Sequence, residues 1–356
     1  MRQEFSFNLH DLLRVRCIDL PKHLEVQLNA DYGWFKASKD DFREEGTELV
    51  VYSLEDASLP PSLFRPIKGA AGRWYADKVD GRVYAVLTRL GETCAVVALD
   101  GGPVLYCSSR PEHVGGVLDA LFAAVEYVLV SHGAMLCKGA VLVREEQAVV
   151  LTGLSGAGKT SAMLRMMGDG WDYLSDNTFI LYEGQALAFR RHIVVHHYHL
   201  EHFSEYFSLR RERKLALWRR CLARVVSVLP SAVQASKKVQ NLCDPYVRLG
   251  LEEVNPERGF VPAAPIVRWV LLLAGAQYTC NVVEDDVRAI RAVHDMVHTD
   301  YVALRQLHDV YGSGESEVDL VLTQCLGNAD KPLIRVCLPD LDSGYGAFCR
   351  DALSDL

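Results

Sequence analysis

Residues 153–160 read Gly-Leu-Ser-Gly-Ala-Gly-Lys-Thr, the complete pattern of a phosphate-binding loop, G-x-x-x-x-G-K-[ST]. The glycines let the backbone turn sharply, so that successive N–H groups can converge on anionic oxygens. The apolar run 148–152 predicts a buried strand before the loop, and residues 160–167 predict a helix that stops at Gly168. Strand, loop and helix in this order place the positive end of the helix dipole under a phosphate group. The chain is therefore expected to bind a polyphosphate.

The individual positions of the loop have separate expected roles. Lys159 is expected to reach the β- and γ-phosphates, and the Thr160 hydroxyl suits Mg²⁺. The remaining loop residues and the first helical turn are expected to cradle the phosphates: Gly153, Ser155, Gly156, Ala157, Gly158 and Ser161. A nucleoside triphosphate and Mg²⁺ are therefore the expected ligands.

The composition is that of a globular protein. The chain has 356 residues, of which 49% are hydrophobic and 24% charged, and its net charge of −8 argues against nucleic-acid binding over the whole surface. Its ten cysteines form no C-x-x-C pair, which favours buried thiols in a reducing cytoplasm. The N-terminus lacks a signal-peptide pattern, and the apolar stretch 114–130 carries Asp119 and Glu126. We therefore expect a cytoplasmic protein in which this stretch is a buried helix and not a membrane span.

Two domains are expected on length and pattern. Residues 1–110 show turn-separated strand patterns and almost no helical periodicity, which predicts a β-rich accessory domain. Its expected strands are 24–28, 49–52, 83–87, 94–99 and 104–107. Residues 111–356 mix both periodicities and predict an α/β catalytic domain built on a mixed sheet around the loop. Its expected helices are 112–131, 160–167, 203–240 and 285–309, and its expected strands are 134–143, 148–152, 172–175, 178–182, 264–275, 320–326 and 333–338.

A carboxylate follows the loop at a suggestive distance. Asp176, in the sequence Leu-Ser-Asp-Asn, lies seventeen residues after Lys159, one helix and one strand later. A strand next to the loop strand would deliver Asp176 close to the γ-phosphate, where a carboxylate can orient Mg²⁺ or accept the proton of an attacking hydroxyl. The alternative is a simple turn, because Ser-Asp-Asn is also good turn chemistry.

These features together resemble a known family. The order of His132-Gly-Ala, strand, phosphate loop, helix and Leu-Ser-Asp-Asn is similar to the catalytic domain of HPr kinase/phosphorylase and its relatives, whose core resembles that of ATP-dependent phosphoenolpyruvate carboxykinases. The resemblance covers about residues 125–185 and implies a divergent, HPr-kinase-like member. It implies that Asp176 accepts the proton in phosphoryl transfer, Thr160 contacts Mg²⁺, and His132 lies near the phosphates. The loop also resembles that of adenylylsulfate kinases, but their Asp-Gly-Asp-Asn motif and N-terminal loop position are missing here.

The chain departs from this family at Asn177, where the family has a second Asp linked to the metal. An asparagine still offers an oxygen to Mg²⁺, but without charge. Thr160, Asp176 and Asn177 are therefore the expected metal-contacting residues. The same departure motivates an alternative, a nucleotide-binding regulatory or scaffold protein with little or no transferase activity.

Two further groups of charged residues have open roles. Arg190 and Arg191 could return toward the phosphates and bind substrate, or they could be exposed to solvent. They stand among the histidines 192, 196, 197, 199 and 202, where His197 and His199 would share one side of an extended segment, as metal ligands or as polar edge residues.

Residues 210–238 carry nine basic residues against one acidic residue, a local charge of +8, and predict a basic amphipathic helix. That helix is either a solvated face or a docking surface for an acidic peptide, protein or nucleic acid.

The sequence therefore predicts an ATP- and Mg²⁺-dependent kinase that transfers the γ-phosphoryl group to a hydroxyl, a serine of a peptide or protein being the favoured acceptor. The alternatives are the regulatory protein and a kinase for a small-molecule or nucleic-acid hydroxyl. The sequence leaves open whether the chain forms a homo-oligomer.

Overall fold

A computed structural model provides the structure of the chain. It describes residues 3–37, 47–64 except 56 and 58, 74–99 except 90 and 91, 102–189 except 155, 192–196, 199, 203, 246–283 except 256, 320–321, 333–338 and 341–354. The fold is mixed α/β, with two mixed sheets and few helices among the described residues. The chain forms two compact units, here called unit 1 (residues 1–137, 180–189 and 285–330) and unit 2 (residues 138–179, 190–284 and 331–356).

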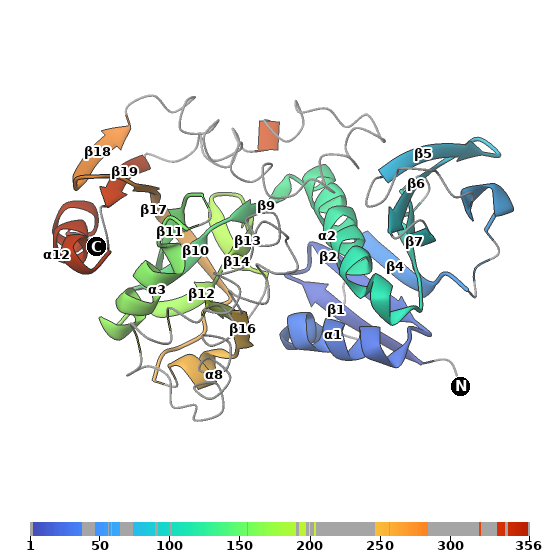
Figure 1. Cartoon of the computed structure of the whole chain (residues 1–356), viewed down its shortest axis with the longest axis horizontal. Helices are drawn as coiled ribbons and strands as arrows, with labels where there is room; N and C mark the ends of the chain where they lie inside the picture. Colours follow the sequence, from blue (N-terminus) through green and yellow to red (C-terminus); the bar gives the residue numbers. More distant parts are fainter. Residues whose placement is uncertain are drawn as a thin grey trace, which may run out of the picture. The chain divides into compact units, whose positions relative to one another are not determined.

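Unit 1 contains an eight-stranded sheet in the order β3-β1-β2-β4-β8-β7-β6-β5 (Figure 1). Its strands are β1 (Glu4–Leu9), β2 (Leu13–Ile18), β3 (Lys36–Ala37), β4 (Thr47–Ser53), β5 (Trp74–Val79), β6 (Arg82–Arg89), β7 (Glu92–Ala98) and β8 (Val104–Cys107). The pairs β2–β4 and β4–β8 are parallel, whereas the other pairs are antiparallel. The strands expected at 49–52, 83–87, 94–99 and 104–107 are thus confirmed within a residue or a few.

The strand expected at 24–28 is wrong, because these residues lie in helix α1 (Lys22–Tyr32). Leu24, Val26 and Leu28 alternate as in a strand, but only the two leucines are buried, and Val26 is 59% exposed. Leu24, Leu28 and Tyr32 repeat every four residues and face the core, which is the spacing of a helix. We also expected almost no helix in residues 1–110, and α1 shows that this expectation is wrong.

Helix α2 (Val114–Ser131) packs against the eight-stranded sheet, mainly on β7, and confirms the helix expected at 112–131. Together with the short turn η4 (Pro111–His113), it is long and apolar enough to cross a membrane by length and composition, with a mean hydropathy of 1.7. Two thirds of that window is buried inside the protein. The compact units place α2 with the N-terminal sheet, and the division expected at residues 110 and 111 stays a prediction.

The strands of unit 2 run in the order β12-β10-β11-β17, and β19 pairs with both β17 and β18. They are β10 (Ala140–Arg144), β11 (Gln147–Thr152), β12 (Asp172–Ser175), β17 (Ala263–Ala274), β18 (Thr279–Val283) and β19 (Leu333–Leu338). The pairs β11–β17 and β17–β19 are parallel, so the central strands of the unit run in one direction. Buried aliphatic residues fill β11 and β17, as expected for strands covered on both faces.

The second sheet also contains β9 (Ala134–Lys138), β13 (Thr178–Tyr182) and β14 (Gln185–Ala188), in the order β14-β13-β9. The single strand expected at 134–143 is in fact two, β9 and β10, which are separated at Gly139. A small separate pair, β15 (Ile193–His196) and β16 (Tyr246–Leu249), is antiparallel. Short helix α8 (Leu251–Val254) follows β16.

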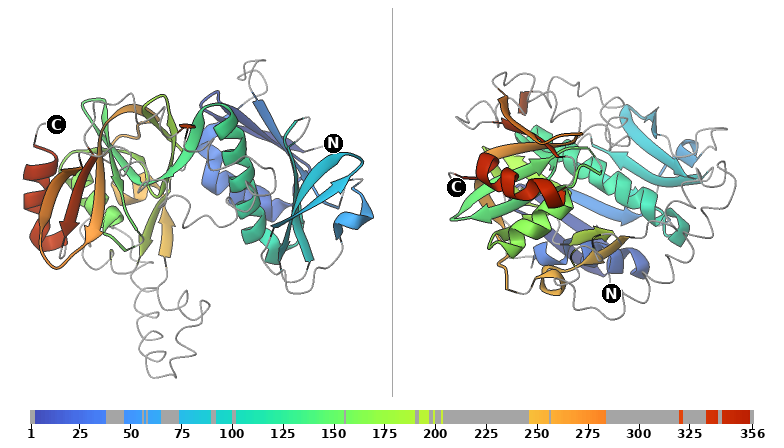
Figure 2. Two further views of the ribbon diagram at one scale, coloured as in Figure 1. Left: turned by 90° about the horizontal axis from the view of Figure 1, so that it is seen from above. Right: turned by 60° about the vertical axis from the view of Figure 1, so that its left-hand side comes forward.

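Helix α3 (Lys159–Gly168) packs on β10 and β11, and helix α12 (Leu341–Ala352) lies beside α3, β18 and β19 (Figures 1 and 2). The guanidinium of Arg165 lies 5.4 Å from the ring centre of Tyr345 and 5.6 Å from that of Phe203. The Tyr345 hydroxyl donates to Asp169 at 2.7 Å, at the C-terminal end of α3. These contacts fix α3 against the C-terminal helix.

The remaining expected elements have mixed outcomes. The strands at 148–152, 172–175, 178–182, 264–275 and 333–338 and the helix at 160–167 are confirmed. The helices expected at 203–240 and 285–309 and most of the strand at 320–326 lie outside the described residues.

Candidate functional site

The segment 153–158 connects buried strand β11 to helix α3, as the sequence predicts. Gly153 has φ of +150°, and a Cβ atom there would lie 2.4 Å from the Leu272 carbonyl oxygen of neighbouring strand β17. Gly156 and Gly158 have φ of +81° and +88°, and no atom of the described residues lies within 4 Å of the place where their Cβ atoms would stand. Only glycine therefore fits at position 153. At positions 156 and 158 the positive φ explains why glycine is favoured.

The end of this segment is also the start of α3. Gly158 is left-handed at the N-cap position, and no described side chain caps the helix there. The Ala157 N–H donates to the Leu154 carbonyl at 3.1 Å, which closes a turn inside the segment. The dipole of α3 thus points its positive end at the segment, as anion binding requires.

Lys159 is the first residue of α3 and is only 9% exposed. Its ammonium donates to the Gly153 carbonyl at 2.8 Å and to the Leu154 carbonyl at 2.9 Å, so it is folded back over the loop. Burial lowers the pKa of Lys159 to about 8, the positive charge of Lys138 lowers it as well, and the carboxylate of Asp176 acts in the opposite direction. The ammonium is therefore held in a confined, electropositive place.

Asp176 directly follows β12 and is 4% exposed. One carboxylate oxygen accepts the Val194 backbone N–H at 2.9 Å, and the other lies 3.4 Å from the Thr160 hydroxyl, which donates to it. The structure thus brings together the carboxylate and the hydroxyl that the sequence analysis selected. Asn177, which follows, is exposed and left-handed with φ of +72°.

The strand order that brings Asp176 close to the loop differs from the expected order, in which the strand before Asp176 lies next to the loop strand. Strand β12 does not lie next to the loop strand, because β10 stands between β12 and β11. In β10, Val141 is opposite both Ser175 of β12 and Val150 of β11. The registers of the pairs β10–β12 and β10–β11 therefore align the end of β12 with the end of the loop strand.

Lys138 and Gly139 form a residue pair that the sequence analysis missed. Lys138 is 7% exposed, and its carbonyl accepts the Thr152 hydroxyl at 3.0 Å, immediately before the loop. The Gly139 N–H donates to the Asn177 carbonyl at 3.2 Å, immediately after Asp176. A Cβ atom on Gly139 would lie 3.1 Å from the Leu151 carbonyl oxygen, so this pair is packed tightly on β11. The signal in the sequence is a lysine and a glycine that interrupt the apolar run 134–143.

The other expected site residues lie in different places, and some of them are outside the described residues. His132 ends α2 in unit 1, where one ring nitrogen shares a hydrogen bond with the Thr47 hydroxyl and the other lies 2.9 Å from the Val128 carbonyl. Its expected place near the phosphates stays a prediction. Ser161 lies in the first turn of α3 and is partly buried. Ser155, Arg190, Arg191, His197, His202 and the basic segment 210–238 lie outside the described residues.

The described residues contain no group of three or more His, Cys, Asp or Glu side chains that could hold a metal ion. The hydroxyl of Thr160 and the carboxylate of Asp176 are nevertheless oxygen donors of the kind that Mg²⁺ prefers, and they adjoin each other. Mg²⁺ usually retains several waters and needs few protein ligands when it binds with phosphates. The donor chemistry therefore fits Mg²⁺.

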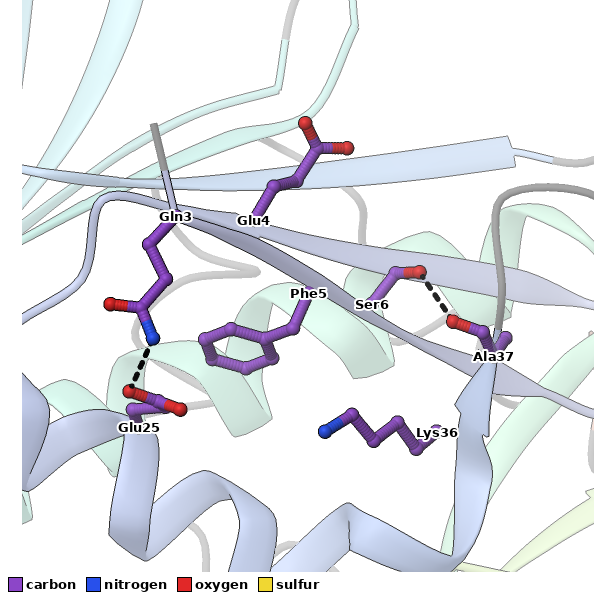
Figure 3. A pocket seen from close by; sticks show the side chains of 7 residues that line it. All are labelled: Gln3, Glu4, Phe5, Ser6, Glu25, Lys36 and Ala37. Atoms are coloured by element: carbon purple, nitrogen blue, oxygen red, sulfur yellow. Dashed lines mark hydrogen bonds between the residues drawn. The ribbon is translucent and has the colours of Figure 1, made fainter. Parts of the chain in front are cut away.

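A separate hollow of about 310 Å³ lies at the edge of the sheet in unit 1 (Figure 3). It is lined by Gln3, Glu4, Phe5, Ser6, Glu25, Lys36 and Ala37. Gln3 donates to Glu25 at 3.1 Å, and the Ser6 hydroxyl donates to the Ala37 carbonyl at 3.3 Å. None of the residues expected at the phosphate loop lines it.

No protein-family model matches the chain, and no curated protein matches it. The residues of the site and their arrangement are therefore what indicates a function for the chain.

Proposed function

We propose that the chain is an ATP- and Mg²⁺-dependent kinase that transfers the γ-phosphoryl group to a hydroxyl, a serine of a peptide or protein being the favoured acceptor. Its catalytic part would be a divergent phosphate-loop domain of the HPr-kinase-like kind. The observation that carries the proposal is the contact between Asp176 and Thr160 at the start of α3. A proton-accepting carboxylate and the hydroxyl next to the phosphate-binding lysine then stand together, as phosphoryl transfer needs.

Each residue has a role in the proposed reaction. The backbone N–H groups of the loop and of the first turn of α3 hold the phosphates, and Lys159 exchanges its contacts with the loop carbonyls for phosphate oxygens. Asp176 orients the acceptor hydroxyl and takes its proton as the oxygen attacks the γ-phosphorus. The bond from the γ-phosphorus to the bridging oxygen breaks, and ADP leaves. The Val194 N–H fixes the carboxylate while it acts.

Thr160, Asp176 and Asn177 would hold the magnesium ion. When bound, Mg²⁺ neutralises negative charge on the β- and γ-phosphates. The acceptor would dock through the basic segment 210–238, with Arg190 and Arg191 as further proposed contacts, which suits an acidic peptide or protein. His132 remains a proposed orienting group.

The test uses the full chain with Mg²⁺, γ-labelled ATP and a fractionated extract of its own host. Asp176→Asn removes the proton acceptor and keeps the side-chain shape, so we expect labelling of the acceptor to fall by about 10²- to 10⁴-fold. Asp77→Asn, the same change in β5 of unit 1, is the matched control and should leave labelling unchanged. Equal labelling by wild type and Asp176→Asn would contradict the proposed role.

A second candidate function, nucleotide binding without transfer, is favoured by the uncharged and exposed side chain of Asn177. The variant Asn177→Asp separates the two candidates, because it supplies a second carboxylate to the metal. Transfer that the wild type lacks and Asn177→Asp gains would establish the binding function. Transfer by the wild type would exclude it.

A further inference from the structure

Two buried lysines, Lys138 and Lys159, stand at the same site, although only Lys159 belongs to the loop pattern. Both are less than one tenth exposed. The carbonyl of Lys138 accepts the Thr152 hydroxyl at 3.0 Å, one residue before the loop over which the Lys159 ammonium is folded. Two ammonium groups of like charge repel each other, and the repulsion is stronger where burial excludes water. A site of this kind is stabilised when an anion of several charges arrives.

The backbone fixes Lys138 at this place. Its carbonyl is bonded to Thr152, the last residue before the loop, and the next N–H is bonded to Asn177, the first residue after Asp176. Lys138 is thus tied on one side to the loop and on the other side to the turn that carries the proposed proton acceptor. All these residues belong to unit 2.

We propose that Lys138 is the second cation of the phosphate site and binds the polyphosphate directly. This inference rests on the proposed function, since it assigns a further residue to the same polyphosphate. A lysine acts here as a compact point charge that can follow the phosphates, and two lysines suit a triphosphate better than a monophosphate. Lys138 would thus provide, from within unit 2, a second positive charge that the loop pattern does not contain.

The first experiment measures the dissociation constants of ATP and of inorganic tripolyphosphate by calorimetry, for the full chain and three variants. Lys138→Met should weaken both ligands by about tenfold or more, because one charge-assisted contact is lost. Lys138→Arg keeps the charge and should restore most of the affinity. Lys78→Met, the same change on exposed β5 of unit 1, should change nothing.

Lys159→Met separates this inference from the proposed function. If the wild type binds neither ligand, the proposed function and the role of Lys138 both fall. If the wild type binds both ligands and Lys159→Met loses them while Lys138→Met matches the wild type, only the role of Lys138 is overturned.

A second measurement needs no variant and decides the matter if Lys138→Met fails to fold. Amine-reactive labelling of the wild type, followed by mass spectrometry, reports the reactivity of each lysine. Tripolyphosphate should slow the labelling of Lys138 and leave that of Lys78 unchanged. Equal labelling of Lys138 with and without tripolyphosphate, at concentrations that saturate binding, would overturn the proposal.

Discussion

The glycine-rich loop of unit 2 between β11 and α3 and the middle of helix α2 in unit 1 both bury ionisable side chains, but among the described residues the loop provides hydrogen-bond partners for them and α2 does not. At the site, Lys159 donates to two loop carbonyls, and Asp176 accepts the Val194 N–H and the Thr160 hydroxyl. On α2, Glu126 has no exposed surface, and neither of its carboxylate oxygens has a hydrogen-bond partner among the residues that the structure describes.

The two regions differ in what surrounds each buried ionisable group, and this difference separates functional candidates from tolerated core residues. Burial raises the pKa of Glu126 well above its usual value, so this carboxyl is kept neutral among apolar neighbours. At the site, backbone groups hold the side chains in place at a glycine-rich turn, and this arrangement needs an unusual backbone. A buried ionisable side chain without hydrogen-bond partners, such as Glu126, is therefore one that the fold only tolerates. Buried side chains that are hydrogen-bonded at a glycine-rich turn, such as Lys159 and Asp176, are ones that the fold holds in position.

The largest effect is expected from Gly153→Ala, which removes the prepared backbone of the site. The new methyl would lie 2.4 Å from the Leu272 carbonyl oxygen on a backbone with φ of +150°. Strain and overpacking together should lower the free energy of unfolding by about 2–5 kcal/mol and abolish ATP binding. Urea denaturation and calorimetry measure the two effects.

Gly156→Ala is the matched control, because its φ is also positive but no described residue lies within 4 Å of the added methyl. It should cost about 1–2 kcal/mol, the cost of left-handed backbone alone. Equal losses for both variants would show that contact with β17 is not what selects glycine at position 153.

An intermediate effect of opposite sign is expected from Glu126→Met, which removes the isolated carboxyl. The free energy of unfolding should rise by about 2 kcal/mol at pH 7, because the folded wild type must keep a proton on this group. The folded-state pKa is raised, so the contribution of Glu126 is fully present below the unfolded value of 4.5 and is lost as the pH rises above it. The difference between variant and wild type should therefore grow by up to about 1.4 kcal/mol per pH unit.

Denaturation in urea between pH 4.5 and 7 measures that slope. Asp119→Asn, on the exposed side of the same helix, serves as the control and should leave the slope as it is in the wild type. A Glu126→Met protein with the wild-type slope would mean that the carboxyl is ionised and stabilised in the folded state, which would remove the contrast between the two regions.

The smallest effect is expected from Tyr345→Phe, which loosens the anchor of α3 but keeps the ring beside Arg165. Loss of the 2.7 Å hydrogen bond to Asp169 should cost about 1 kcal/mol of stability and leave the affinity for ATP unchanged. Tyr278→Phe, which loses a similar bond to Asp351, is the control at the other side of α12. A weaker affinity for ATP in Tyr345→Phe alone would show that the far end of α3 also positions the loop.

Some errors of the sequence analysis have a common physical origin. The spacing of Leu24, Val26 and Leu28 satisfies a strand, and only the burial of Tyr32 on the same face identifies a helix. The run 134–143 is apolar throughout apart from Lys138, and its division into two strands depends on the close packing of Gly139 against Leu151. Short-range patterns leave such choices open because the packing partner is distant in sequence.

The sequence by itself determined the elements whose causes are local. The strand, loop and helix at 147–168 follow from apolar patterning and from glycines that tolerate positive φ, and the pair Thr160 and Asp176 follows from their spacing. Only the tertiary structure decided that β10 separates β12 from β11 and that the backbone of Lys138 is bonded to Thr152, immediately before the loop. The reason is that strand order and the meeting of charges depend on contacts between segments far apart along the chain, which no local pattern encodes.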